Sequence, residues 1–303
     1  MHFIERDWLC ANHVLFVAPD EPATLIDSGY VTCAAETLAV IEARLSGRPL
    51  DRLINTHIHS DHIGGNRALQ ERFPALEIVV PAAEVPALEA WDAPAQMLGY
   101  ADQRCPRFAW QDQLQPGDSF RLGGCDWHVL ASPGHDMGSI VLYCPSERLL
   151  ISADALWESG FGFIPPQAID ARPLAAQRAT IDLLADLDVD RVLPGHGPMF
   201  DDFRGALGRA RARLEAFAAD DLRIARHVVQ TMFIFALTWR GSLAVADLPA
   251  YVNAVPLHRD YNAQFFRLSD EAYADWLLRT CCGKNKLTVV ADRVTPAARG
   301  DGR

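Results

Sequence analysis

The sequence predicts an α/β fold in which two β-sheets pack face to face with helices on the outside. Short apolar stretches typical of strands recur between residues 12 and 193, and helical patterns fall between several of them. Half of the 303 residues are hydrophobic, which is enough for a sizeable core. Strands interleaved with helices, with early neighbours arranged like hairpins, favour mixed sheets in a layered structure.

The individual elements follow from these patterns in chain order. Apolar runs predict strands over residues 12–18, 23–26, 53–55, 77–80, 127–131, 140–143, 149–152 and 191–193. Helical spacing predicts helices over residues 33–45, 66–72 and 174–186.

The character of the chain changes beyond residue 205, where helices dominate. Helical patterns cover residues 205–219, 221–239, 247–253 and 270–280, and a short strand-like run covers 286–290. We therefore expect a first domain over residues 1–205, a small helical or winged-helix-like C-terminal domain over 206–295, and a disordered tail over 296–303. Since the C-terminal part is not strongly basic, we expect a lid or a dimer surface rather than a DNA-binding module.

The segment from residue 57 to residue 62 concentrates metal-binding side chains. His57, His59, Asp61 and His62 occupy four of six consecutive positions just after a predicted strand. Histidine is the commonest protein metal ligand, and a carboxylate adds an oxygen donor. A polar turn that happens to be rich in histidine is the alternative, but four good ligands in six residues favour a metal site, and the spacing suggests two ions.

Three later residues can complete such a site. His135, Asp154 and His196 each follow a short apolar run and lie among small residues. Strand ends are where α/β proteins build their sites. Any one of these residues alone would be a weak signal, but together with the first segment they make a set of seven ligands.

This set resembles the defining motifs of the metallo-β-lactamase superfamily of metal-dependent hydrolases. The resemblance covers about residues 10 to 205, so it implies that the first domain is catalytic and is an αββα sandwich. It also implies that the early strand motif at residues 25–29 places Asp27 beside the site without making it a ligand. By the same resemblance metal one is held by His57, His59 and His135, metal two by Asp61, His62 and His196, and Asp154 bridges the two.

The implied cofactor is a pair of divalent ions, with zinc expected and with iron or manganese also compatible with a His/Asp shell. Two ions about 3.5 Å apart share a hydroxide and polarise the bond under attack. Asp61 either orients this nucleophile and passes its proton to the leaving group, or serves only as a ligand. The predicted reaction is hydrolysis of a small ester-type bond, a thioester or a lactone. A serine nucleophile elbow, a P-loop and a dinucleotide fingerprint are absent from the sequence.

Substrate choice depends on the residues that follow Asp154 in the sequence. The ligand set is similar to that of the glyoxalase II and thioesterase branch and to that of lactonases, but residues 163–165 (Phe-Ile-Pro) replace the basic residue with which that branch grips glutathione. Trp157, Phe161 and Phe163 either line the substrate pocket or belong to the core. Two alternatives stay open: a mononuclear iron enzyme resembling persulfide dioxygenases, and a ligand-binding member of the fold without catalysis.

The composition of the chain narrows the classes of partner and the cellular compartment that we expect. A net charge of −11 disfavours nucleic acid. The seven cysteines form no zinc-type motif, and their odd number argues against a complete disulfide framework, so we expect a reducing cytoplasm. The chain begins without a signal-peptide pattern and has no apolar run long enough to span a membrane. The expected partner is a small-molecule substrate, with a homodimer as an option.

Overall fold

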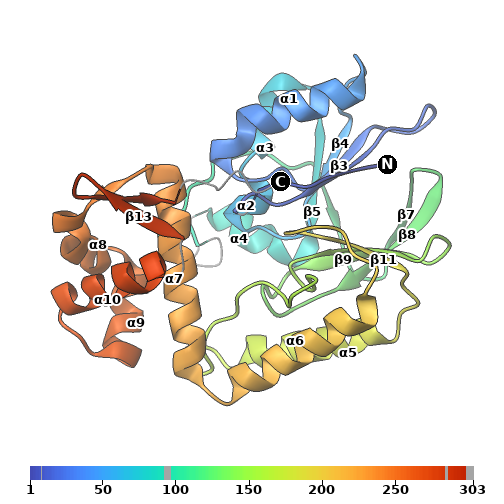
Figure 1. The fold of residues 1–303 in the computed structure, drawn as a ribbon. Helices are drawn as coiled ribbons and strands as arrows, with labels where there is room; N and C mark the ends of the chain where they lie inside the picture. The colour runs from blue at the N-terminus through green and yellow to red at the C-terminus, as the bar shows by residue number, and fades with distance from the viewer. Residues whose placement is uncertain (8, 92–96, 284–285, 298–303) are drawn as a thin grey trace. The chain divides into compact units, whose positions relative to one another are not determined.

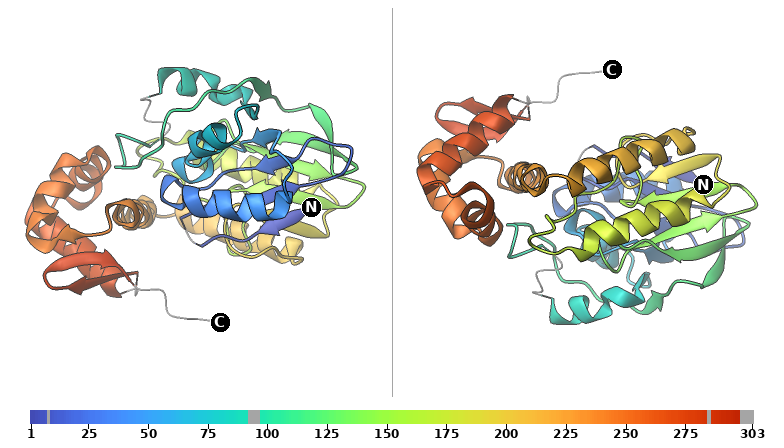
Figure 2. Two further views of the ribbon diagram at one scale, coloured as in Figure 1. Left: turned by 90° about the horizontal axis from the view of Figure 1, so that it is seen from above. Right: turned by 90° about the horizontal axis from the view of Figure 1, so that it is seen from below.

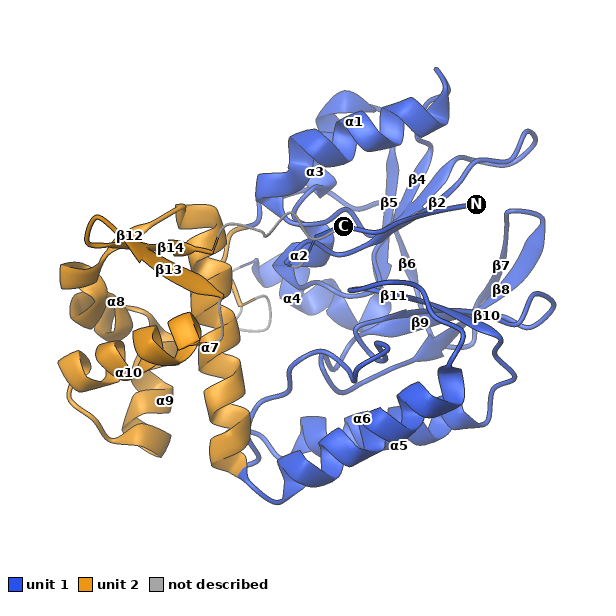
Figure 3. Cartoon of the chain, viewed as in Figure 1, with its two compact units in different colours: residues 1–96, 105–220 blue, residues 97–104, 221–303 orange. Residues whose placement is uncertain are grey.

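The computed structural model describes residues 1–7, 9–91, 97–283 and 286–297. Its chain divides into two units, shown in Figure 3. The first contains residues 1–96 and 105–220, and the second contains residues 97–104 and 221–303.

The first unit is built on two mixed sheets (Figure 1). The six-stranded sheet has the order β1-β2-β3-β4-β5-β6, and the five-stranded sheet has the order β11-β10-β9-β8-β7. The strands of the first sheet are β1 His2–Ile4, β2 His13–Phe16, β3 Thr24–Ile26, β4 Arg52–Ile54, β5 Glu77–Pro81 and β6 Asp112–Leu114. Those of the second are β7 Ser119–Leu122, β8 Cys125–Ala131, β9 Ile140–Cys144, β10 Leu149–Ala153 and β11 Arg191–Pro194.

Helices cover the outer faces of the two sheets. In Figure 2, α1 lies over the first sheet when the unit is seen from above, and α5 and α6 lie over the second sheet when it is seen from below. The α-helices of this unit are α1 Ala34–Leu45, α2 Ser60–Ile63, α3 Asn66–Arg72, α4 Val85–Ala90, α5 Arg172–Ala185 and α6 Phe203–Ala218. The predicted αββα sandwich is confirmed.

The alternating direction of side chains along each strand explains why the unit has two separate hydrophobic cores. In β2, Val14 and Phe16 belong to the core that also contains Trp127 of the second sheet, whereas Leu15 between them belongs to the core that contains Ile41 of α1. Successive side chains of a strand point to opposite faces, so one apolar strand supplies both cores. A run that is apolar at every position therefore marks a strand covered on both sides.

The ligand-bearing loops leave the same edge of the sandwich. Strands β3, β4 and β5 pair in parallel, and so do β10 and β11, while β8 and β10 both run antiparallel to β9. The carboxyl ends of β8, β10 and β11 therefore lie on one side of their sheet. Each of these three strands ends at or shortly before one of the predicted ligands that follow the first segment.

Sequence patterns missed the strands that are polar or short. The residues of β6 and β7 are half-buried or exposed except for Leu122, so they lack the apolar run on which the prediction depends. β7 forms a hairpin with β8 through Gly123 and Gly124, whose φ angles of 62° and 82° suit a two-residue turn that glycine favours. The glycine pair was the available signal for this hairpin.

The second unit combines helices with a small sheet. Its helices are α7 Asp221–Arg240, α8 Leu248–Ala254, α9 Pro256–Tyr261 and α10 Asp270–Gly283, and its antiparallel strands β12 Leu243–Ala244, β14 Arg293–Pro296 and β13 Leu287–Val290 pair in that order. Residues 97–104 join this unit through Asp102, whose carbonyl accepts from the Trp239 indole and whose carboxylate pairs with Arg240. Within the described residues no helix combines the length and the apolar composition needed to cross a membrane.

Two expected boundaries differ from the structure. Residue 205 lies inside α6, whose buried side chains belong to the first unit, and the units divide after Asp220 instead. Pro296, expected at the start of a disordered tail, pairs with Leu287 in the small sheet, and the Ala297 amide donates to the carbonyl of Lys286. Residue 205 belongs to the first unit because it lies within α6, and residues 296 and 297 are held by the β13–β14 hairpin. The rest of the expected tail, residues 298–303, lies outside the described residues.

A buried leucine of the first sheet offers a direct test of this packing. Leu53 is 0% exposed in β4, so Leu53→Ala should lower the free energy of unfolding by about 2–5 kcal/mol through lost burial and the cavity left behind. The matched control is Leu183→Ala, because Leu183 is 40% exposed and the same change there should cost far less. Urea unfolding of both variants measures the difference, and equal losses would contradict the assignment of Leu53 to the core.

Candidate metal centre

The structure brings all seven predicted ligands into three overlapping groups of donor atoms. Within each group the donor atoms lie within 4.8 Å of one another. The groups are His57 with His59 and His135, His57 with His62 and Asp154, and Asp61 with His62 and His196.

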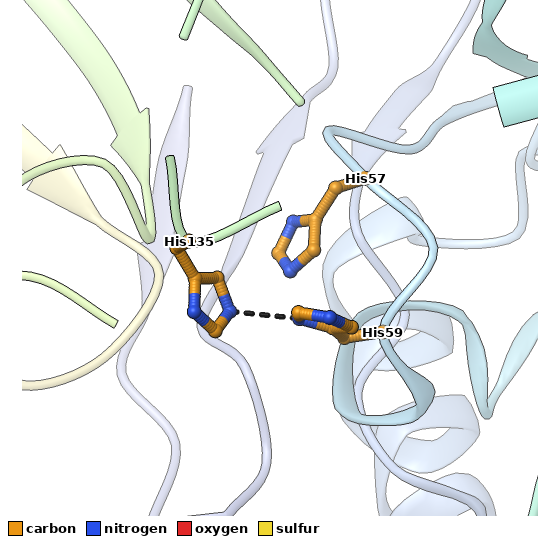
Figure 4. A group of neighbouring side chains, drawn as sticks. All are labelled: His57, His59 and His135. Atoms are coloured by element: carbon orange, nitrogen blue, oxygen red, sulfur yellow. Dashed lines mark hydrogen bonds between the residues drawn. The ribbon is translucent and has the colours of Figure 1, made fainter. Parts of the chain in front are cut away.

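The first group is made of three imidazoles from two loops. His57 and His59 follow β4 and His135 follows β8, and their rings point toward a common space (Figure 4). His59 Nδ1 and His135 Nε2 are 2.7 Å apart. Three imidazoles converging in this way are a usual set of nitrogen donors for a transition metal.

Asp154, a member of the second group, also faces His135 of the first group and His196 of the third. Its Oδ2 is 3.3 Å from His135 Nε2, and its Oδ1 is 3.3 Å from His62 Nε2 and 3.7 Å from His196 Nε2. One oxygen of this carboxylate therefore faces His135, and the other faces His62 and His196. This is the arrangement that a carboxylate shared by two cations requires.

Asp27 orients the ring of His62, a member of the second group, by contacting the ring nitrogen that faces away from Asp154. Its carboxylate is buried and accepts hydrogen bonds from the Thr56 amide at 2.9 Å and from the Thr56 hydroxyl at 2.8 Å. The same carboxylate accepts from His62 Nδ1 at 2.8 Å. The other ring nitrogen, Nε2, is thereby left to face Asp154. A carboxylate behind a histidine fixes the ring and its tautomer in this way at many metal sites.

His135 is held by three separate contacts. Its Nδ1 hydrogen-bonds to the carbonyl of Phe163, and its backbone amide donates to Gln177 Oε1 at 3.1 Å. Gln177 is 0% exposed, and its amide nitrogen donates to the carbonyl of Ala155 at 2.9 Å, so this side chain joins the loops after β8 and β10. Gly162 packs against the ring, where a Cβ atom would come within 2.5 Å of His135 Cγ.

Asp61 and His196 meet on the other side of the centre. Asp61 Oδ2 is 3.2 Å from His196 Nε2. The Asn12 side chain holds the loop of His196, because its amide nitrogen donates to the carbonyls of Pro194 at 3.0 Å and Gly197 at 2.8 Å. Neither Asn12 nor Gln177 could be recognised from sequence, since both act on residues far away in the chain.

A pair of buried acids lies behind His59 and was also missed from sequence. Glu84 and Asp136 are 4% and 8% exposed, and their carboxyl groups affect each other's pKa. Asp136 Oδ2 is 3.8 Å from His59 Nε2, and Asp136 Oδ1 accepts from the Gly138 amide at 2.7 Å. Burial and the neighbouring Asp136 raise the pKa of Glu84 to about 10, so the pair holds a proton and a single negative charge at neutral pH. The position of Asp136 next to His135 was the only signal for this pair in the sequence.

The electrostatics of the centre favour cations. Burial lowers the pKa of His57 well below its usual range, and burial together with His59 lowers the pKa of His135 to about 4. Both rings are therefore neutral at pH 7 and have a lone pair available. Burial alone would raise the pKa of Asp154, but His196 and His62 outweigh it and hold the pKa well below its usual range.

His62 differs from His57 and His135 in the direction in which its pKa is shifted. Burial alone would lower its pKa, but the carboxylates of Asp154 and Asp27 outweigh this effect and raise the pKa well above its usual range. Without a metal the ring carries the charge that compensates the two acids. A cation at His62 would take over that role and release the proton.

The residues fit a metal site on an observation independent of their resemblance. His57 Nε2 is buried and has no hydrogen-bond partner among the described residues. An unpartnered buried nitrogen is costly unless a ligand completes it. A divalent cation among the surrounding donors would supply the missing partner.

Two of the three aromatic residues considered for the pocket border this centre. Trp157 Nε1 donates to Asp154 Oδ1 at 3.2 Å, and the ring lies 5.2 Å from that of His196. Phe163 stacks on His59 with ring centroids 5.8 Å apart. Phe161 is instead 0% exposed and packs edge-on against Phe217 of α6, so it belongs to the core.

Sequence comparisons agree with the fold and with this site. The chain is 31% identical over 169 residues to the acyl-coenzyme A thioesterase MBLAC2 of Gallus gallus, a match that covers 50% of this chain and 58% of that protein. It is 30% identical over 204 residues to a hydroxyacylglutathione hydrolase of Rhizobium johnstonii, covering 66% of this chain and 68% of the relative. The match therefore spans less than two thirds of the thioesterase's own length.

Solved structures show the same fold. A metallo-β-lactamase family protein of Thermus thermophilus superposes with a TM-score of 0.60 at 17% identity, covering 97% of each chain. The protein TTHA1623, solved in a di-iron-bound form, superposes with a TM-score of 0.52 at 28% identity, covering 71% of this chain and 98% of its own. The family model of the metallo-β-lactamase superfamily matches residues 7–196, a range that contains every residue of the donor groups described above. With most of its length inside that match, and with the fold of these structures, the chain belongs to the metallo-β-lactamase superfamily.

Proposed function

We propose that the protein is a hydrolase that uses two divalent metal ions, zinc in the first place, to cleave a small thioester or lactone. The observation that carries this proposal is the position of Asp154, whose two oxygens face different histidine groups. In this proposal one ion is held by His57, His59 and His135, the other by Asp61, His62 and His196, and Asp154 is shared. Relatives that are named as hydrolases support the reaction class.

The donor set suits hydrolysis. Ions bound there would supply the Lewis acidity that lowers the pKa of a water molecule and stabilises negative charge on the carbonyl oxygen under attack. The protein's own contribution is to hold the donors in place. Asp27, Gln177 and Asn12 each fix a loop that carries a donor, and all three are buried.

Asp61 is the proposed catalytic carboxylate. Burial alone would raise its pKa, but the hydrogen bond from His196 outweighs this and lowers it, so the side chain is ionised at neutral pH. An ionised carboxylate at this position can accept a proton from an attacking water and return it to the leaving group. Its contact with His196 is equally consistent with its proposed part in the second donor group.

The aromatic residues beside the centre favour an apolar acyl portion. Trp157 and Phe163 both lie against donor residues and are only half-buried, so they offer apolar surface at the reacting bond. No basic residue stands at positions 163–165 to grip a glutathione carboxylate. We therefore favour an acyl thioester other than a glutathione thioester, or a lactone.

The remaining expectations belong to the same proposal. A net charge of −11 supports a small-molecule substrate over nucleic acid. We also propose a cytoplasmic location without a membrane partner. For the C-terminal domain we propose a structural role, as a lid or as the surface of a homodimer.

Metal content and a substrate panel together test the reaction class. The purified full chain is analysed for metals and then assayed against acyl-coenzyme A thioesters, acyl-glutathione thioesters, lactones and simple esters. Two divalent ions per chain with turnover of thioesters or lactones support the proposal. One iron per chain with oxygen uptake on a persulfide substrate would replace it by a dioxygenase. Two bound metals without any hydrolysis would favour a ligand-binding protein.

Removing single ligands should abolish metal binding and turnover together. Asp154→Ala and His135→Ala each delete a donor, so we expect metal affinity and kcat/KM to fall by at least about 100-fold. The matched controls are Asp126→Ala and His128→Ala, since both side chains are exposed on β8 and lie outside the donor groups. Full activity in either ligand variant would refute the assignment.

The contact between Gly162 and His135 provides a subtler test. Gly162→Ala places a methyl group on the His135 ring, so we expect a loss of metal affinity of about 10–100-fold with the fold intact. Gly208→Ala is the control, because a Cβ atom there meets nothing within 4 Å and the residue lies in α6. Metal titration of both apoproteins measures the effect. An unchanged affinity in Gly162→Ala would show that His135 is not held through this contact.

A further inference from the structure

A tight turn at residues 157–160, in the loop after β10, is closed on itself and tied to α6. The Trp157 amide donates to the carbonyl of Gly160 at 2.6 Å, and the Gly160 amide donates back to the carbonyl of Trp157 at 3.3 Å. Glu158 is exposed at the tip of the turn, and its carbonyl accepts from Arg209 Nε of α6 at 2.6 Å. The backbone of this turn therefore has a defined shape and a defined attachment to the helix.

A second arginine of α6 contacts the same turn. The guanidinium of Arg213 lies 5.0 Å from the ring centroid of Phe161 and 5.1 Å from that of Phe217. Gly160 leaves room for this guanidinium, since a Cβ atom there would come within 2.9 Å of Arg213 Nη1. A cation over the face of an aromatic ring is attracted to it electrostatically. Because Phe161 is 0% exposed, Arg213 connects the turn to a buried part of the chain.

The indole of Trp157 reaches the metal centre at one oxygen of Asp154. Its Nε1 donates to Asp154 Oδ1 at 3.2 Å. That oxygen also faces His62 Nε2 at 3.3 Å and His196 Nε2 at 3.7 Å. The other oxygen, Oδ2, faces His135 Nε2 at 3.3 Å. The indole therefore contacts the side of the carboxylate that is directed to His62 and His196.

A donor on a shared carboxylate acts on one ion more than on the other. A carboxylate oxygen has two lone pairs, so Asp154 Oδ1 can accept from the indole and still bind a cation. The hydrogen bond holds the carboxylate in one rotation, and loss of an outer partner of this kind lowers metal affinity by about 10–100-fold. Since the indole holds Oδ1, the loss should fall on the ion that this oxygen serves.

We propose that Trp157 is a positioning residue that sets the affinity for the ion at His62 and His196, and that Arg213 keeps its indole in place through the turn. The hydrogen bond to Asp154 Oδ1 and the attachment of the turn to α6 carry this proposal. It rests on the two-ion site of the proposed function. Trp157 then has a role beyond that of apolar surface for the substrate.

Stepwise zinc titration of the apoprotein of the full chain, followed by calorimetry, tests the proposal without an activity assay. Trp157→Phe keeps an aromatic ring but removes the N–H donor, so we expect one of the two binding steps to weaken by about 10-fold and the other to stay unchanged. Gly162→Ala crowds His135 of the other donor group and should weaken the opposite step. Trp239→Phe is the matched control, because it removes an indole hydrogen bond of the second unit, to the carbonyl of Asp102, and should leave both steps unchanged.

The outcomes separate this proposal from the proposed function. Wild-type protein that binds a single ion would overturn both. Two bound ions with titration steps that Trp157→Phe leaves unchanged, or weakens equally, would overturn the role of Trp157 alone. The same holds if Trp157→Phe and Gly162→Ala weaken the same step.

Replacement of Arg213 tests the link through α6. Arg213→Met keeps the length of the side chain but removes its charge, so the step that Trp157→Phe weakens should weaken by about 3–10-fold, and Arg213→Lys should restore part of the loss. The double variant should lose no more than Trp157→Phe alone, because both changes act on one contact. Arg211→Met, at an exposed residue of α6 that pairs with Asp182 at 3.0 Å, should have no effect. Additive losses in the double variant would overturn the link.

Discussion

The buried carboxylate of Asp27 makes the interactions on which the ligand segment at residues 57–62 depends. It receives hydrogen bonds from the amide and the hydroxyl of Thr56 and from His62 Nδ1. Asp27 follows β3, Thr56 follows β4 and His62 lies in α2, so one carboxylate joins three segments. A buried charge is stable only when such donors surround it. The same requirement fixes the His62 ring with its Nε2 toward Asp154, and the residue itself accepts a left-handed φ of 56° to complete the arrangement.

The later ligands, His135, Asp154 and His196, depend on side chains that connect loops. Gln177 from α5 binds the loops after β8 and β10, and Asn12 binds the loop after β11. Loops at the edge of a sheet are the mobile part of a fold unless such contacts fix them. Here the donors of several segments meet at Asp154, whose carboxylate contacts His135, His62 and His196. The rigid sheets supply the edge, and the buried amides hold the loops there.

Reaction class and substrate choice are separate properties of this site. The donor atoms alone suit the activation of water, because neutral imidazoles and ionised carboxylates are what a pair of divalent cations needs. Selectivity depends on the side chains around them, and here Trp157 and Phe163 border the donors while Phe161 is buried against α6.

The amino-acid sequence by itself determined the buried strands, the main helices and the seven proposed ligands. Buried strands are continuous apolar runs, and most of the ligands are clustered or directly follow such a run, so short-range patterns are sufficient to find them. The tertiary structure alone decided the polar strands β6 and β7, the division after Asp220, and the place of Phe161 in the core. It also decided the pair of Glu84 with Asp136, whose members come from distant segments. Contacts of this kind arise only when packing brings those segments together, and no local spacing records them.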